Sequence, residues 1–326
     1  MRTLSAPNLS SNQQKTYGPG ISIVVPVYNS ESTLNNLVET VKVEMSLLEV
    51  DWEVILVDDG SIDSSWRRIC ALAEADTRVI GIRFAQNYGQ HPALLAGIRL
   101  AKYAITVTID DDLQHRPSSI RNLIAKIDTN VSLVYGVSID EEHNAARNVS
   151  SRVSKWFLSR AVGMKQAANA SAFRAFNTNL RESWNGVTDT RISIDVLLSW
   201  STKDYQIVNV PMDKRAVGKS NYTFNKLLKH LFNMVLGFST RPLTIITIAG
   251  CVLGLVGFLV LCWVLFMHFF GSSSVAGFTF LASLISLMGG MQLVCMGIIG
   301  QYLGRIYDRS MGKPIYQIKS STSDLG

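Results

Sequence analysis

The feature that most limits how this chain can fold is a long stretch without charge near its carboxyl end. Between Pro242 and Gly304 there is no Asp, Glu, Lys or Arg. Two apolar segments fit inside it, Leu243 to about His268 and about Phe278 to Leu303, separated by the short polar turn Gly271–Ser274. Each exceeds the roughly 20 residues that cross the hydrocarbon core of a bilayer. The sequence predicts a two-span transmembrane hairpin over residues 242–304; two helices buried in a soluble protein are the alternative.

Basic residues beside these segments predict the orientation of the hairpin. Arg241 precedes the first segment, and Arg305, Arg309 and Lys313 follow the second, whereas the connecting turn carries neither Lys nor Arg. Because basic flanks favour the cytoplasmic side, we expect both termini and the long amino-terminal part to be cytoplasmic, with residues 305–326 as a cytoplasmic tail.

The ends and the overall charge exclude several classes of protein. The first residues are polar, include prolines and lack an apolar core, so residues 1–20 are expected to be a disordered lead and not a signal peptide. The net charge of +6 comes without an Arg-rich nucleic-acid motif. It suits an anionic membrane surface or a phosphate-bearing substrate better than nucleic acid. The four cysteines have no metal-ligand spacing and imply no disulfide.

The part before the hairpin alternates strands and helices. Apolar, β-branched runs lie at residues 21–29, 52–57, 79–84 and 105–109, with helical periodicity between them. Such nearly continuous apolar strands are typical of a parallel sheet that is covered on both faces. We therefore predict an α/β domain over residues 21–222, in which the loops after all four strands open at one edge of the sheet.

Polar side chains follow each of these strands and are expected to converge in one crevice. They are Tyr28, Asn29, Asp58, Asp59, Asn87 and the adjacent acids Asp110, Asp111 and Asp112. Three neighbouring carboxylates repel one another, so the cluster requires either water or a cation. The spacing of Asp110 and Asp112 allows both to contact one hard divalent ion. A solvated acidic turn is the alternative.

The phosphate-binding loops of other classes of enzyme are missing. There is no GxxxxGK[ST] loop and no GxGxxG after a strand, which argues against an NTPase and a dinucleotide dehydrogenase. The remaining class of ligand is a nucleoside diphosphate that binds through a metal ion. The metal would neutralise the departing diphosphate.

These motifs carry a resemblance to a known family. The segments Val25–Asn29, Val57–Ser61, Asn87–His91 and Asp110–Gln114 resemble the signature set of family 2 glycosyltransferases, which have the GT-A fold, a Rossmann-like, mostly parallel sheet. The segment Arg215–Tyr222, followed by the hairpin, is similar to the polyisoprenyl-phosphate glycosyltransferases. That group includes dolichyl-phosphate mannose synthase, bactoprenol glucosyltransferases and undecaprenyl-phosphate aminoarabinose-type transferases. The resemblance covers about residues 21–317.

The resemblance assigns a donor side to the crevice. It implies that Asp110 and Asp112 are the DxD motif that holds Mg²⁺ or Mn²⁺, with Asp112 the more direct ligand and Asp110 nearer the ribose and phosphate. The residues that it places around the nucleotide sugar are Pro26, Tyr28, Asn29, Glu31, Asp58, Asp59, Asn87, Asp111 and Gln114.

The resemblance also implies a site for the phosphate of a lipid acceptor. Its residues are expected to be Arg174, Arg215, Lys219, Ser220 and Tyr222. Arginine offers phosphate a bidentate fork, and Gly218 lets the backbone approach closely. A basic surface turn near a membrane is the alternative.

One departure from the family concerns a possible base. Members of the family carry an Asp shortly before a Phe-Arg or Leu-Arg pair, whereas this chain has Ala167–Ala172 before Phe173-Arg174. A phosphate monoester has a second pKa of roughly 6, so the acceptor is already an oxyanion and needs no base. Asp195 is a candidate substitute acid, and a helix-surface or capping carboxylate is the alternative.

Two amphipathic segments support a lipid acceptor. Residues 151–162 and 224–238 set apolar side chains against basic ones, as in helices that lie in the headgroup layer. The second segment belongs to an interfacial helix region that we place at residues 223–241. For both segments, packing against the protein's own core is the alternative.

These observations predict an integral membrane enzyme, with a bacterial inner membrane as the expected location. The expected reaction is inverting transfer of a sugar from a UDP-sugar to a polyprenyl phosphate. The alternatives are a glycosyltransferase of the same fold with a glycolipid or polysaccharide acceptor, and an inactive membrane scaffold that binds nucleotide sugar. The resemblance further suggests a homotetramer, and a flippase and a downstream glycosyltransferase as partners in building a cell-envelope polysaccharide.

Overall fold

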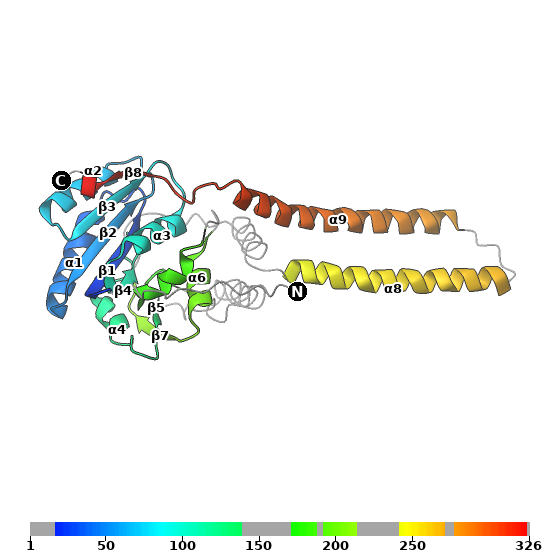
Figure 1. Cartoon of the computed structure of the whole chain (residues 1–326), viewed down its shortest axis with the longest axis horizontal. Helices are drawn as coiled ribbons and strands as arrows, with labels where there is room; N and C mark the ends of the chain where they lie inside the picture. Colours follow the sequence, from blue (N-terminus) through cyan, green and yellow to red (C-terminus); the bar gives the residue numbers. More distant parts are fainter. Residues whose placement is uncertain (1–16, 139–170, 188–191, 214–240, 271–276, 325–326) are drawn as a thin grey trace, which may run out of the picture.

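The computed structural model describes residues 17–138, 171–187, 192–213, 241–270 and 277–324. Its core is an eight-stranded sheet with the strand order β7-β5-β6-β4-β1-β2-β3-β8 (Figure 1). The strands are β1 (Gly18–Val27), β2 (Trp52–Asp58), β3 (Val79–Phe84), β4 (Tyr103–Thr108), β5 (Leu133–Ser138), β6 (Arg174–Asn177), β7 (Tyr205–Val210) and β8 (Ile318–Ser321). The central strands β4, β1, β2 and β3 are parallel, as predicted. The sheet becomes mixed on either side of them, because β6 runs antiparallel to β4 and β8 runs antiparallel to β3.

Helices cover both faces of this sheet. They are α1 (Leu34–Leu48), α2 (Ser65–Ala75), α3 (Gln90–Leu100), α4 (Ile120–Ile124) and α6 (Ile194–Ser201), with 3-10 turns η1 (Pro117–Ser119), η4 (Thr178–Trp184) and η5 (Thr322–Asp324). Side chains of α1, α2 and α4 pack in one core cluster and those of α3 and α6 in the other. Every residue of β2 is buried, which explains the unbroken apolar run Val54–Val57 at its centre.

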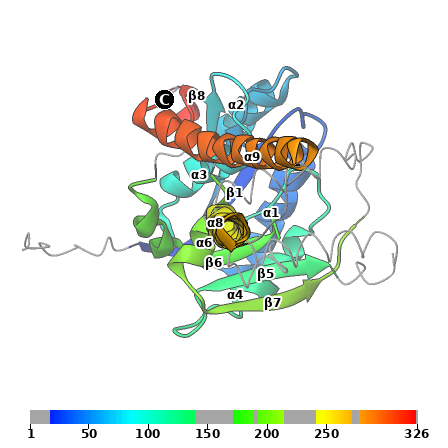
Figure 2. The same ribbon diagram turned by 90° about the vertical axis from the view of Figure 1, so that its right-hand side faces the viewer.

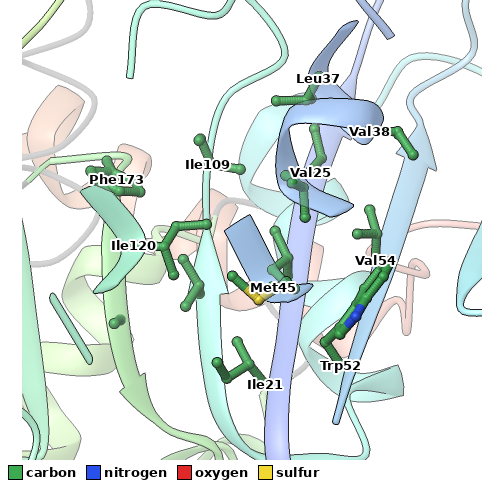
Figure 3. Packing of buried hydrophobic residues seen from close by; sticks show 14 of the residues in the cluster. Ile21, Val25, Leu37, Val38, Met45, Trp52, Val54, Ile109, Ile120 and Phe173 are labelled. Carbon is green, nitrogen blue, oxygen red and sulfur yellow. The ribbon is translucent and has the colours of Figure 1, made fainter. Parts of the chain in front are cut away.

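Alternate residues of β1 supply the two cores. Ile23 and Val25 face α1, as Figure 3 shows for Val25, which lies beside Leu37. Val24 faces α3 on the opposite side. This alternation fixes the sheet between two apolar layers and leaves its edge at the carboxyl ends of the strands free for polar loops.

The amino-terminal boundary differs from the prediction. The disordered lead was placed at residues 1–20, but β1 begins at Gly18, and Tyr17 accepts a hydrogen bond from Arg181 Nε at 3.0 Å. Gly20 adopts φ 138°, and a Cβ there would lie 2.4 Å from the carbonyl oxygen of Asp51. Gly20 therefore lets the chain pass close to Asp51 within the first residues of β1, a feature that apolar periodicity misses. Residues 1–16 lie outside the described part.

Two long helices extend away from the sheet. They are α8 (Arg241–Phe270, 30 residues) and α9 (Phe278–Ser310, 33 residues), and both project on the same side of the domain (Figures 1 and 2). None of the helices in the described ranges combines the length and the apolarity that a membrane crossing requires. The transmembrane hairpin therefore stays a prediction.

The segment after α9 returns to the sheet. Residues 305–326 were predicted to be a tail, but α9 continues to Ser310 and β8 then pairs with β3, with Ile82 opposite Ser321. The pattern of this short strand is too polar to reveal it in the sequence. Tertiary pairing with the exposed edge of β3 supplies the backbone hydrogen bonds that stabilise it.

Candidate active site

A cavity of about 270 Å³ opens at the carboxyl ends of β1, β2 and β4. It is lined by Pro26, Val27, Tyr28, Asp59, Asn87, Gly89, Gln90, Asp110, Asp111 and Asp112. The loops that follow the four parallel strands thus meet at one edge. Seven of the residues predicted to hold donor or metal lie here: Pro26, Tyr28, Asp59, Asn87 and the three acids. Val27, Gly89 and Gln90 were not predicted as site residues, although Val27 belongs to the Val25–Asn29 motif and the other two to the Asn87–His91 motif.

Asp111 is tied to the loop after β1. Its carboxylate accepts the backbone N–H of Tyr28 at 3.2 Å and the hydroxyl of Ser30. Burial raises the pKa of Asp111, and these hydrogen bonds oppose the rise. Ser30 therefore holds the loop after β1 against the acid cluster through its hydrogen bond to Asp111. It does not cap the following helix, whose N-cap is Thr33.

Asp110 carries the most perturbed carboxylate of the cluster. It accepts a hydrogen bond from Gln90 Nε2 at 2.7 Å. Burial, followed by repulsion from Asp112 and Asp111, raises the pKa of Asp110 to about 6. The site therefore holds more negative charge than its own groups compensate, which a cation would relieve.

Asp112 lies on a tight turn at the end of the cluster. Its carboxylate accepts the backbone N–H of Gln114 at 3.1 Å. Leu113 between them has φ 60°, a left-handed conformation that costs a bulky residue about 1 kcal/mol or more. The strained turn fixes the direction in which Asp112 leaves the strand. Gln114, predicted as a donor contact, lies outside the cavity lining.

The two acids after β2 have different environments. Asp59 lines the cavity and accepts the backbone N–H groups of Tyr88 and Gly89 at 2.7 and 2.8 Å. Burial raises the pKa of Asp59 despite these bonds. Asp58 is fully buried, accepts the N–H of Ser61 at 2.9 Å and lies 3.2 Å from Arg83 Nε. The predicted donor contact at Asp58 is therefore not supported: its carboxylate fixes the loop from within the protein.

Asn29 and Glu31 do not face the acid cluster. They line a separate hollow of about 460 Å³ together with Ser32, Asn35, Asp63 and Arg68. Asn29 has φ 55°, and its side-chain oxygen accepts the N–H of Ile62 at 3.0 Å. Because Asn29 and Glu31 are close to Tyr28 in sequence, a shared pocket was expected. The left-handed backbone at Asn29 turns the chain away from the acid cluster.

Arg174 and Asp195 form an ion pair beneath the site. Arg174 is only 1% exposed, and its Nε donates to the Thr108 hydroxyl at 3.1 Å. The structure thus places the predicted phosphate ligand Arg174 in an enclosed position, where its guanidinium is paired with Asp195. Asp195 lies in the first turn of α6, where it pairs with Arg174 and does not cap the helix, whose N-cap is Ser193. Its predicted role as a substitute acid stays a prediction.

Asp213, which precedes the predicted acceptor loop in sequence, lies beside the turn that carries Asp112. Arg215, Lys219, Ser220 and Tyr222 lie outside the described residues, as do the two amphipathic segments, 151–162 and 224–238. Asp213, the last described residue before that loop, donates its N–H to the Gln114 carbonyl at 2.8 Å. Arg116 also pairs with both carboxylate oxygens of Asp213 at 2.6 Å. These contacts join the approach to the loop to the strand end that carries Asp112.

The donor atoms around the cavity determine whether it fits a divalent metal. Within the described ranges, no group of three or more His, Cys, Asp or Glu has the arrangement of a complete metal site. The donors present are carboxylate oxygens, and the raised pKa of Asp110 marks an unbalanced negative charge. Mg²⁺ typically takes one or two carboxylates and completes its shell with water and substrate phosphates. The residues therefore fit an ion that arrives with a diphosphate.

Comparison with known proteins places the chain in a family. The model of glycosyl transferase family 2 matches residues 22–182. An undecaprenyl-phosphate 4-deoxy-4-formamido-L-arabinose transferase from Yersinia enterocolitica is 31% identical over 303 residues, which are 92% of this chain and 92% of that protein. The chain belongs to glycosyl transferase family 2. The protein of the same name from Pseudomonas aeruginosa is 30% identical over 92% of this chain and 89% of its own length.

Solved structures show a more distant likeness. A glucosyl-3-phosphoglycerate synthase from Mycobacterium tuberculosis, crystallised with Mn²⁺, UDP and glucosyl-3-phosphoglycerate, has a TM-score of 0.49 and 19% identity. The likeness covers 68% of this chain and 80% of that one. It is too distant to assign a ligand to this family 2 protein.

Proposed function

We propose that this protein transfers a sugar from a nucleoside-diphosphate sugar to a polyprenyl phosphate such as undecaprenyl phosphate. The proposed donor is a UDP-sugar. One observation carries the proposal: relatives that match 92% of the chain are named as undecaprenyl-phosphate transferases of a formamido-arabinose. The cavity at the strand ends supports this proposal. Its lining combines acidic groups that suit a metal-bound diphosphate with Tyr28 and Asn87, which could contact the nucleoside.

On the donor side, Asp110 and Asp112 would hold Mg²⁺ or Mn²⁺. When bound, the ion would neutralise the charge that develops on the departing nucleoside diphosphate. Asp111 keeps the β1 loop against the cluster through its bonds to Tyr28 and Ser30. Asn87 and Tyr28 line the remaining wall, where amide, hydroxyl and ring contacts are available to the nucleoside.

On the acceptor side, the nucleophile is an oxygen of the lipid phosphate. It forms a bond to the anomeric carbon as the bond from that carbon to the diphosphate breaks, and attack from the opposite face inverts the configuration. No proton has to be removed, because a phosphate monoester is largely dianionic at neutral pH. Arg215, Lys219, Ser220 and Tyr222 would hold the phosphate; Arg174 would not, since Asp195 occupies it.

Residues 242–304 would anchor the enzyme in a bacterial inner membrane, with the catalytic domain and both termini in the cytoplasm. The lack of charge from Pro242 to Gly304 and the basic flanks support this arrangement. A lipid acceptor requires the active site to lie close to a bilayer, which a hairpin next to the catalytic domain would provide. The homotetramer, the flippase and a downstream glycosyltransferase stay proposals from the family resemblance.

The full-length protein, with UDP-sugars that carry a radiolabelled sugar, undecaprenyl phosphate and Mg²⁺ or Mn²⁺, tests this function. The donor panel includes UDP-4-deoxy-4-formamido-L-arabinose, glucose, galactose and amino sugars. Label in an undecaprenyl-phosphate sugar supports the proposal. Label only in glycolipid or polysaccharide indicates the alternative acceptor, and donor binding without turnover indicates an inactive scaffold.

A further inference from the structure

The segment after α9 is joined to the loop that borders the donor cavity. The backbone N–H of Ala85, directly after β3, donates to the Gln317 carbonyl at 2.9 Å. At the other end of β8, the hydroxyl of Thr322 accepts the N–H of Gly81 at 2.9 Å. The antiparallel strand therefore begins at the edge of the sheet that holds the cavity and runs away from it.

Aromatic contacts continue this connection toward the cavity. The ring of Tyr316 stacks on Phe84 with a centroid distance of 5.0 Å and an interplanar angle of 9°. Phe84 in turn meets Tyr88 edge to face, with centroids 5.6 Å apart. At the far end of the stack, Arg99 donates a hydrogen bond to the Tyr316 hydroxyl at 3.2 Å. Phe84 is 1% exposed, and the partly buried rings of Tyr88 and Tyr316 pack against the same core cluster.

The last member of the stack is bonded to a cavity acid. The backbone N–H groups of Tyr88 and Gly89 are the donors that hold the two oxygens of Asp59. Their positions depend on the path of the chain after Phe84, and that path lies against Tyr316. Covering the edge of a sheet needs only backbone pairing. The Tyr316 ring adds a side-chain contact to this backbone pairing. It holds Phe84, the last residue of β3, after which the loop that borders the cavity begins.

We propose that Tyr316 is a positioning residue for the donor site, acting through Phe84 and Tyr88 on Asp59. The strand that follows α9 is then part of the donor pocket's support, although it lies outside the matched family domain at residues 22–182. Only a short link separates this support from α9, since that helix ends at Ser310 and Ile315 is already buried. This inference rests on the proposed function for the identity of the ligand alone.

The test compares three variants of the full-length protein. Tyr316→Ala removes the stack, Tyr316→Phe retains it without the hydroxyl, and Lys319→Ala changes an exposed side chain on the same strand. Amide hydrogen exchange of residues 85–89 is measured without ligand, and UDP binding is measured by calorimetry with Mg²⁺. The melting temperature reports whether each variant is folded. Tyr316→Leu, which keeps most of the apolar volume, replaces Tyr316→Ala if that variant does not fold.

We expect Tyr316→Ala to increase exchange at Tyr88 and Gly89 and to weaken UDP binding by about tenfold, the scale set by the loss of an aromatic pair. Tyr316→Phe and Lys319→Ala should match the wild type in both measurements. Unchanged exchange in a folded Tyr316→Ala protein overturns the inference, as does increased exchange with unchanged UDP affinity. If the wild type itself binds no UDP, the proposed function fails, and the exchange data alone then decide whether Tyr316 positions the loop.

Discussion

The buried guanidinium of Arg174 and the partly buried carboxylate of Asp195 form an ion pair that joins β6 to the first turn of α6. The guanidinium is 1% exposed, and it also lowers the pKa of Asp110 from its side of the cluster, against the larger effect of burial. Asp195 therefore acts as the counterion of a buried cation. We therefore infer that Asp195 has a structural role, and not the catalytic one that the missing acid in Ala167–Ala172 suggested.

Replacing Asp195 tests this assignment. Asp195→Asn leaves the buried guanidinium without its counterion, and we expect a loss of about 3 kcal/mol in the free energy of unfolding. The pH dependence of turnover should keep its shape, because no base is removed. The double variant Arg174→Met with Asp195→Leu should recover much of the stability, since a buried ion pair can be replaced by apolar side chains. A pH–rate profile that loses an ionisation in Asp195→Asn would contradict the assignment.

Asp112 should be required for metal-dependent turnover. We expect Asp112→Asn to lower kcat/KM by about a thousandfold, because the charge of the departing diphosphate is no longer balanced through a bound ion. The melting temperature should be nearly unchanged, since Asp112 lies at the surface of the cavity and not in the core. Asp51→Asn, at the opposite edge of the sheet, is the matched control. Activity of Asp112→Asn at the control level would remove Asp112 from the metal site.

The raised pKa of Asp110 predicts how stability changes with pH in metal-free protein. In the folded state the carboxyl of Asp110 has a pKa of about 6, whereas the ordinary pKa of an Asp is 3.8. Its contribution to stability is thus complete below the unfolded pKa and lost as pH rises through about 6.

Asp110→Asn removes this loss because the amide stays neutral. With a chelator at about pH 8, the variant should melt on the order of 3 °C above the wild type, and the difference should vanish at about pH 4. Thermal unfolding at both pH values measures it. Adding Mg²⁺ should stabilise the wild type more than the variant. A wild type that melts above Asp110→Asn in chelator at the higher pH would show that repulsion within the cluster is already compensated.

Arg215 should act on the acceptor alone. We expect Arg215→Ala to raise KM for undecaprenyl phosphate by between about tenfold and a hundredfold, with KM for the UDP-sugar within about twofold. The neighbouring Lys214→Ala is the control for a general loss of positive charge. Equal increases in both KM values, or equal effects of the two variants, would count against a phosphate-binding role at Arg215.

Gly97 should be needed for the contact between α3 and the sheet. A Cβ at Gly97 would lie 2.4 Å from Val24 Cγ1 and 3.2 Å from Val57 Cγ2. Because the side chains of Val24 and Val57 already fill this space, Gly97→Ala should lower the free energy of unfolding by about 1–3 kcal/mol. Gly186→Ala, whose Cβ meets nothing within 4 Å, should change it little. Denaturant unfolding of both variants makes the comparison, and equal midpoints would show that α3 can move away from β1.

Local patterns were enough to predict the central half of the sheet. The apolar runs of β1 to β4 are bounded by turn residues, and parallel topology then requires their carboxyl ends to share one edge. For this reason Tyr28, Asp59, Asn87 and the three acids were predicted together and lie together. Side-chain direction was less predictable: the left-handed backbone of Asn29 sends Asn29 and Glu31 into another hollow.

The sequence by itself determined which residues could form strands and where acids would follow them, because both depend on neighbours within a few positions. Only the tertiary structure decided which of those acids face the cavity, that Asp195 neutralises Arg174, and that Tyr316 stacks on Phe84. Each of these relationships joins residues from separate elements, Tyr316 and Phe84 across most of the chain. Burial and pairing of such groups depend on the packed layers around them, which no local pattern of residues encodes.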